Sequence, residues 1–158
     1  MEKLNLPASK VHFTPLAVRS LWAGIIAGVL LGLFLKGVEY VTSLKVYTLL
    51  LNVDYIPLLN QLQLSEFAEF LLHLIISVLL ALVLALIVNW KGTAWSIRTR
   101  LYFYMAVNTA VGLLLYPTTA LSTRTPDLLD LPALLFWLTG HLLYGLLLGW
   151  MMRERIPR

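Results

Sequence analysis

The run from Phe67 to Trp90 constrains the fold of this chain more than any other stretch, because it is apolar at almost every position. A helix of about 20 apolar residues rises about 30 Å, which matches the hydrocarbon core of a bilayer. The run is therefore long enough to cross a membrane, and three further stretches are similarly apolar. The sequence predicts four transmembrane helices, at about residues 17–41, 66–90, 99–116 and 131–152.

The composition indicates the same class of protein. Of the 158 residues, 59% are hydrophobic and only 13% are charged, whereas about 25% of residues are charged in a typical soluble domain. The chain has no cysteine, which excludes disulfides, thiolate metal sites and cysteine nucleophiles. We therefore predict an all-α polytopic membrane protein, a bundle of four transmembrane helices that forms a single domain over residues 1–158.

The connection between the first two predicted helices, residues 42–64, is more than a simple loop. Leu44 to Leu51 is mostly apolar but too short to span a bilayer, and Asn52, Asp54 and Pro57 break the apolar run after it. We predict an interfacial or re-entrant segment at the outer surface that does not cross the membrane.

The basic residues predict the orientation of the chain. Nine of the twelve lie in the N-terminal region, the loop between the second and third helices, and the C-terminal tail. These nine are Lys3, Lys10, Arg19, Lys91, Arg98, Arg100, Arg153, Arg155 and Arg158. The remaining three are Lys36, Lys45 and Arg124. The positive-inside rule then predicts that both termini are cytoplasmic. Because these residues form no single basic patch, we do not expect nucleic-acid binding.

Several polar side chains interrupt the predicted helices. Glu69 and His73 lie one turn apart on one face, while Asn108 and His141 lie at similar depths in two other helices. An ionisable group within a membrane costs roughly 2.5 kcal/mol or more, so it normally faces a partner or a wet cavity. We therefore predict that Glu69, His73 and His141 face one another across the bundle. The predicted ligand-binding or proton-handling residues are Lys36, Glu39, Glu69, His73, Asn108, His141 and Tyr144, with Lys36 and Glu39 near the outer mouth.

Glycines recur at helical spacing in the first and last helices. Gly24, Gly28 and Gly32 are four residues apart, as are Gly145 and Gly149. Small residues at this spacing let neighbouring helices approach closely. We predict that these glycines pack helices together, and the same stripes could support a homo-oligomer.

Parts of three helices are similar to a known family. The relevant segments are Gly24–Gly28, Phe34–Glu39, His73–Ser77 and Thr139–Leu142. They resemble the corresponding helices of the YagU-like bacterial inner-membrane proteins, although the first outer loop is shorter here. That family has no established biochemical activity. The resemblance implies a bacterial inner-membrane location and draws attention to Lys36, Glu39, His73 and His141.

Four kinds of function fit these features. The leading interpretation is an outward-facing intramembrane pocket that binds or conducts a small ligand, an ion or protons. A second is a metal or haem protein ligated by His73, His141 and Glu69, although Lys36 would oppose a cation. An enzyme is less favoured, because no nucleophile or catalytic motif is identifiable. A fourth is an accessory or assembly subunit, whose partners would be the lipid bilayer and another membrane protein.

Overall fold

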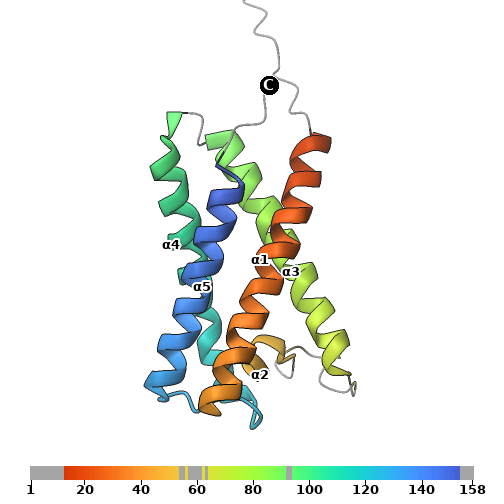
Figure 1. Ribbon diagram of the computed structural model, residues 1–158, viewed down its shortest axis with the longest axis vertical. Coiled ribbons are helices and arrows are strands. Elements are labelled where there is room, and N and C mark those ends of the chain that lie inside the picture. Colours follow the sequence, from red (N-terminus) through yellow and green to blue (C-terminus); the bar gives the residue numbers. More distant parts are fainter. Residues whose placement is uncertain (1–12, 54–55, 57–61, 63, 92–93, 154–158) are drawn as a thin grey trace, which may run out of the picture.

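The computed structural model describes residues 13–53, 56, 62, 64–91 and 94–153. In this part of the chain every regular element is a helix, which confirms the all-α class. The long helices α1, α3, α4 and α5 run side by side, and the short elements α2 and η3 lie near one end (Figure 1). The helices are α1 (Phe13–Thr42), α2 (Val46–Leu51), α3 (Glu66–Lys91), α4 (Ile97–Leu115), η3 (Tyr116–Leu121) and α5 (Leu131–Met151).

Three of the described helices are long and apolar enough to cross a membrane, as expected for a membrane protein. They are Pro15–Thr42 within α1, Glu66–Lys91 and Leu131–Met151. The fourth predicted span, 99–116, coincides with most of α4, which is not among them. The polar side chains of Arg98, Arg100 and Asn108 make α4 less apolar than the other long helices.

The outer surface of the bundle is rich in large apolar side chains. Trp22, Leu33, Ile75 and Leu79 are each more than half exposed. A soluble monomer rarely exposes so much contiguous apolar surface. Small residues such as Ala23 and Ala27, in contrast, are fully buried between the helices. This distribution suits a chain that faces lipid on its outside.

Glycines lie where the long helices approach most closely. A Cβ atom on Gly24 would come within 2.6 Å of the Val78 Cα atom, so α1 and α3 touch backbone to backbone. A Cβ on Gly145 would lie 2.7 Å from the Tyr104 carbonyl oxygen, which brings α5 equally close to α4. No side chain fits at these two positions without a shift of the neighbouring backbone.

The segment after α1 turns back into the end of the bundle. Ser43 adopts a positive φ of 62°, and α2 follows almost at once. Its side chains Val46, Leu49 and Leu51 are buried against the long helices. The described part of the 42–64 connection is thus partly helical and stays at the end where α1 stops and α3 begins (Figure 1). Asp54 and Pro57, which the sequence analysis singled out there, lie outside the described residues.

The two ends of the bundle differ in the charges they carry. We call the end with α2 the α2 end; the start of α1 and the end of α5 lie at the opposite end (Figure 1). At that opposite end the Arg19 Nε donates a hydrogen bond of 3.0 Å to the Met151 carbonyl oxygen, which ties α1 to the last turn of α5. The described acidic residues, such as Glu39, Glu66 and Asp130, lie at or near the α2 end.

Candidate functional site

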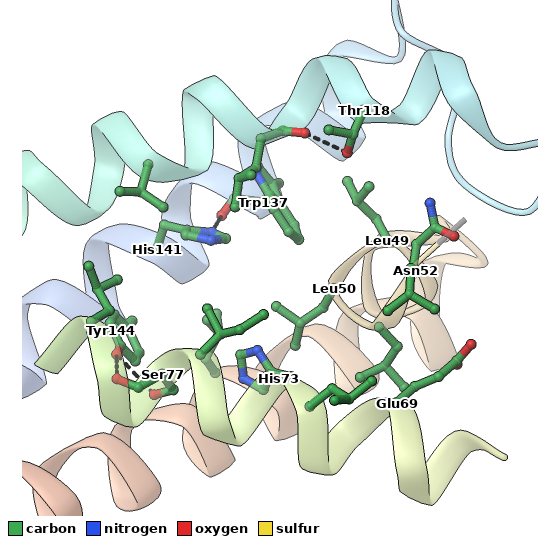
Figure 2. A pocket seen from close by; sticks show the side chains of 18 of the residues that line it. Leu49, Leu50, Asn52, Glu69, His73, Ser77, Thr118, Trp137, His141 and Tyr144 are labelled. Atoms are coloured by element: carbon green, nitrogen blue, oxygen red, sulfur yellow. Dashed lines mark hydrogen bonds between the residues drawn. The ribbon is translucent and has the colours of Figure 1, made fainter. Parts of the chain in front are cut away.

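A cavity of about 170 Å³ lies between α3, α4 and α5 near the α2 end, where α2 covers part of it (Figure 2). Its volume is similar to that of an engineered cavity of about 150 Å³ that binds benzene. Most of the lining is apolar, with contributions from residues such as Leu49, Leu72 and Val111. Polar groups enter from three long helices. The structure brings five of the predicted site residues together here: Glu69, His73, Asn108, His141 and Tyr144.

The two histidines lie on opposite walls of this cavity, as Figure 2 shows. His73 lies on α3, and its Nε2 is 3.2 Å from the Gly28 carbonyl oxygen. His141 lies on α5, and its Nδ1 is 2.9 Å from the Trp137 carbonyl oxygen. Because a carbonyl oxygen can only accept, the nitrogen facing it carries the hydrogen in each ring. In the neutral imidazoles the His73 Nδ1 and the His141 Nε2 are then left as acceptors.

Asn108 supplies a third acceptor from α4. Its side chain is completely buried, and its Nδ2 donates a 2.7 Å hydrogen bond to the Tyr104 carbonyl oxygen. The amide oxygen Oδ1 has no hydrogen-bond partner in the described part of the chain. An unpaired buried polar atom costs about 1–3 kcal/mol, so it calls for an explanation.

Ser77 and Tyr144 join α3 to α5 at the inner limit of the cavity. The Ser77 Oγ donates to the Gly24 carbonyl oxygen at 2.7 Å, and the Tyr144 hydroxyl lies 2.9 Å from this Oγ and 3.1 Å from the Ser77 carbonyl oxygen. These contacts hold α1, α3 and α5 together. They also place the hydrogens of both hydroxyls on protein acceptors.

Glu69 pairs with a residue that the sequence analysis did not connect to the site. Its side chain is only 6% exposed, and its Oε1 lies 3.3 Å from the Arg124 Nη1. Arg124 follows η3 in the chain, so it reaches Glu69 from the connection between α4 and α5. Helical spacing predicted an interaction of Glu69 with His73, but spacing within one helix carries no information on such a loop residue.

Lys36 and Glu39 lie outside this cavity. They line a second, more open pocket of about 420 Å³ at the α2 end, together with Glu66 and Arg124, and Glu69 borders both pockets. Lys36 and Glu39 therefore lie at the rim of the cavity, on the side where the outer mouth was predicted. They do not pair with each other, although their spacing would allow it.

Both rim residues have partners on other elements. The Lys36 Nζ lies 2.6 Å from the Glu66 Oε1, and the Tyr47 hydroxyl donates to the same oxygen at 3.0 Å. Partial burial, and then the hydrogen bond to Glu66, raise the pKa of Tyr47 above its usual value, so this hydroxyl remains a donor at neutral pH. Glu39 instead accepts hydrogen bonds from the backbone N–H and the hydroxyl of Thr48, at 2.9 and 2.8 Å.

Trp137 is a site residue that the sequence analysis missed. Its Nε1 donates a 2.7 Å hydrogen bond to the Gly112 carbonyl oxygen, and its ring centroid lies 4.3 Å from that of His141. Gly112 also lies close to His141, because a Cβ atom at position 112 would be 2.7 Å from the His141 Cγ. The sequence feature that could have identified Trp137 is its spacing of four residues from His141, which places both on one face of α5.

The arrangement does not resemble a metal centre. In the described residues, no group of three or more histidine, cysteine, aspartate or glutamate side chains is placed to hold an ion. A zinc site normally has at least three protein ligands, and two imidazole nitrogens alone fall short of that number. The polar groups of the cavity are better suited to hydrogen bonding.

No family model, curated protein or solved structure matches this chain. The resemblance to the YagU-like proteins therefore stays a prediction from the sequence segments that carry it.

Proposed function

We propose that this chain is a small integral membrane protein whose intramembrane cavity binds a small ligand. The observation that carries the proposal is the Oδ1 of Asn108, which has no hydrogen-bond partner among the described residues although Asn108 is fully buried at a cavity that two histidines also line. A buried acceptor without a partner lowers stability. Its presence is explained if a bound molecule supplies the missing hydrogen bond.

The form of the cavity favours binding over conduction. The α3 residues that line it extend from Glu69 to Leu80. Beyond them Ala81, Leu84 and Leu148 are at most 2% exposed and form part of the packed core. The cavity therefore ends within the bundle instead of continuing to the opposite end.

We further propose that α4 is the fourth transmembrane helix and that the protein is a multi-pass protein of a bacterial cytoplasmic membrane. Two observations support the fourth span: α4 packs extensively against α5, and it runs beside the three apolar helices (Figure 1). With four spans both termini lie on the same side. The excess of basic residues at the end opposite α2 favours a cytoplasmic location for the termini and an outer location for the α2 end.

Lipid is the proposed surrounding of the bundle, and the exposed apolar side chains support this. The glycine stripes could in principle support a homo-oligomer. They do not favour one here, because these glycines already pack helices within one chain. The YagU-like relationship, with the bacterial location it implies, is part of the same proposal.

Labelling of single cysteines tests the pocket and its orientation together, because the natural chain has none. Val111→Cys places a thiol in the cavity lining, whereas Val83→Cys places one on the apolar exterior of α3. A charged, membrane-impermeant methanethiosulfonate is added to intact cells. We expect Val111→Cys to react at least about tenfold faster than Val83→Cys, because only a hydrated thiolate is reactive.

Two further positions report orientation in the same experiment. Thr123→Cys, at the α2 end, should be labelled in intact cells, whereas Ser96→Cys should react only after the cells are made permeable. Equal rates at Val111→Cys and Val83→Cys would contradict the pocket. Labelling of Ser96→Cys but not of Thr123→Cys in intact cells would show that the orientation is the reverse of the one proposed.

A further inference from the structure

We infer that the ligand of this cavity is a molecule of about benzene size that has a largely apolar body and presents O–H or N–H hydrogen-bond donors. The inference rests on the proposed function and adds to it the chemical class of the ligand. It follows from which polar atoms of the cavity are already paired and which are left over.

The donors that α3, α4 and α5 bring to the cavity are engaged by the protein itself. The Trp137 Nε1 donates to Gly112, and the Ser77 hydroxyl to Gly24. The Tyr144 hydroxyl has two acceptors on Ser77 within reach. The Asn108 amide nitrogen also donates one hydrogen to its own helix. These α3, α4 and α5 donors therefore have little capacity left for a ligand.

The acceptors, in contrast, are left over on three helices. They are the His73 Nδ1 on α3, the Asn108 Oδ1 on α4 and the His141 Nε2 on α5, none of which is hydrogen-bonded within the described residues. A ligand that itself only accepts hydrogen bonds, such as an ether or a ketone, would leave all three unpaired. A ligand that donates would satisfy at least one of them.

The size and the surroundings of the cavity define the rest of the ligand. A volume of about 170 Å³ suits a single six-membered ring with a small substituent, by comparison with the engineered benzene-binding cavity of about 150 Å³. The cavity also borders the apolar exterior, because α3 and α4 make little direct contact and the lining residues Ile75 and Ile76 are more than half exposed. A mostly apolar molecule can therefore reach it from the bilayer.

The charged group at the cavity does not require an ionic ligand. Glu69 is the charged residue among the described lining residues, and Arg124 compensates it from the rim. Lys36 is paired with Glu66 in the outer pocket. The donor is thus a neutral O–H or N–H group, and a test with both kinds distinguishes the two.

Fluorine NMR on the full-length protein in lipid nanodiscs tests this class with matched probes. 4-Fluorophenol and 4-fluoroaniline carry donors, whereas 4-fluoroanisole has the same ring and no donor. Empty nanodiscs correct for partitioning into lipid. We expect wild-type protein to bind at least one of the donor probes about tenfold more tightly than 4-fluoroanisole, a ratio typical of one satisfied buried hydrogen bond.

Three variants locate the effect. Asn108→Leu should weaken the donor probe about tenfold more than it weakens 4-fluoroanisole, since it removes an acceptor and its effect on the volume of the cavity is common to both probes. Asn108→Ala is a second variant in case leucine disturbs the fold, and thermal unfolding checks both. Ser20→Ala is the matched control, because the Ser20 Oγ is also buried without a partner among the described residues but lies outside the cavity.

The outcomes separate the two proposals. Equal binding of all three probes, abolished by the cavity-filling variant Val111→Phe, would overturn the donor class and leave the binding cavity intact. Binding of no probe above the level of empty nanodiscs would overturn the donor class, and the reactivity of Val111→Cys would then decide separately whether an open cavity exists. Preference for 4-fluoroanisole would also contradict the inference.

Discussion

Replacement of Gly145 by alanine is expected to destabilise the folded protein by about 1–3 kcal/mol, the usual cost of overpacking a close contact. The added Cβ would lie 2.7 Å from the Tyr104 carbonyl oxygen and 2.8 Å from the Met105 Cα. Both are backbone atoms of α4, so they can move only if the helix moves. Intrinsic helix propensity alone would predict the opposite sign, because alanine is favoured over glycine by roughly 0.8–1 kcal/mol.

Gly37→Ala is the matched control for this effect. Gly37 lies in α1, and no atom of the described residues lies within 4 Å of its ideal Cβ position, so the substitution should be neutral or slightly stabilising. Unfolding of the purified protein by dodecyl sulfate, followed by circular dichroism, measures both changes. If Gly145→Ala and Gly37→Ala had the same effect, the close approach of α5 to α4 would be wrong.

Asn108→Leu is expected to raise the free energy of unfolding of the ligand-free protein by about 1–3 kcal/mol. The substitution removes the buried Oδ1, for which the described part of the chain offers no hydrogen-bond partner. The substitution also removes the hydrogen bond from the Asn108 Nδ2 to the Tyr104 carbonyl oxygen. That bond lies within α4 and joins no two helices, so its loss should cost little stability. The adjoining cavity gives the larger leucine side chain room.

Ser77→Ala should have the opposite sign in the same assay. The Ser77 Oγ is hydrogen-bonded to α1 and lies within hydrogen-bond distance of the Tyr144 hydroxyl, so its loss removes contacts that link three helices. We expect a loss of about 0.5–1.5 kcal/mol, the net contribution of a typical hydrogen bond. Destabilisation by Asn108→Leu as large as that by Ser77→Ala would show that Asn108 is a structural residue and not a binding residue.

Much of the fold can be read from hydropathy, because a membrane helix must be apolar along most of its length. The run that predicted a helix over 66–90 is α3, Glu66–Lys91. The most polar predicted span became α4, which lacks the apolar character of the other three long helices. Helix α4 shows the limit of this approach, because Arg98 and Arg100 in its first turns, together with Asn108 at the cavity, lower its hydropathy.

The partners of the polar residues could be predicted only in part. Depth along each helix placed His73, Asn108 and His141 at one level, because depth depends only on the rise per residue, and all three line the same cavity. Pairing depends on how the helices are rotated and on the connections between them. Lys36 therefore pairs with Glu66 instead of Glu39, and Glu69 pairs with Arg124.

Cross-linking across the cavity tests most directly whether α3 and α5 face each other around an accessible space. The double variant His73→Cys/His141→Cys replaces the two histidines that lie on opposite walls (Figure 2), and the control His141→Cys/Val83→Cys has one thiol on the exterior of α3. Dibromobimane fluoresces strongly only when both of its arms have reacted. We expect bright, monomeric protein from the first variant and background signal from the control. Background signal from both would contradict the cavity.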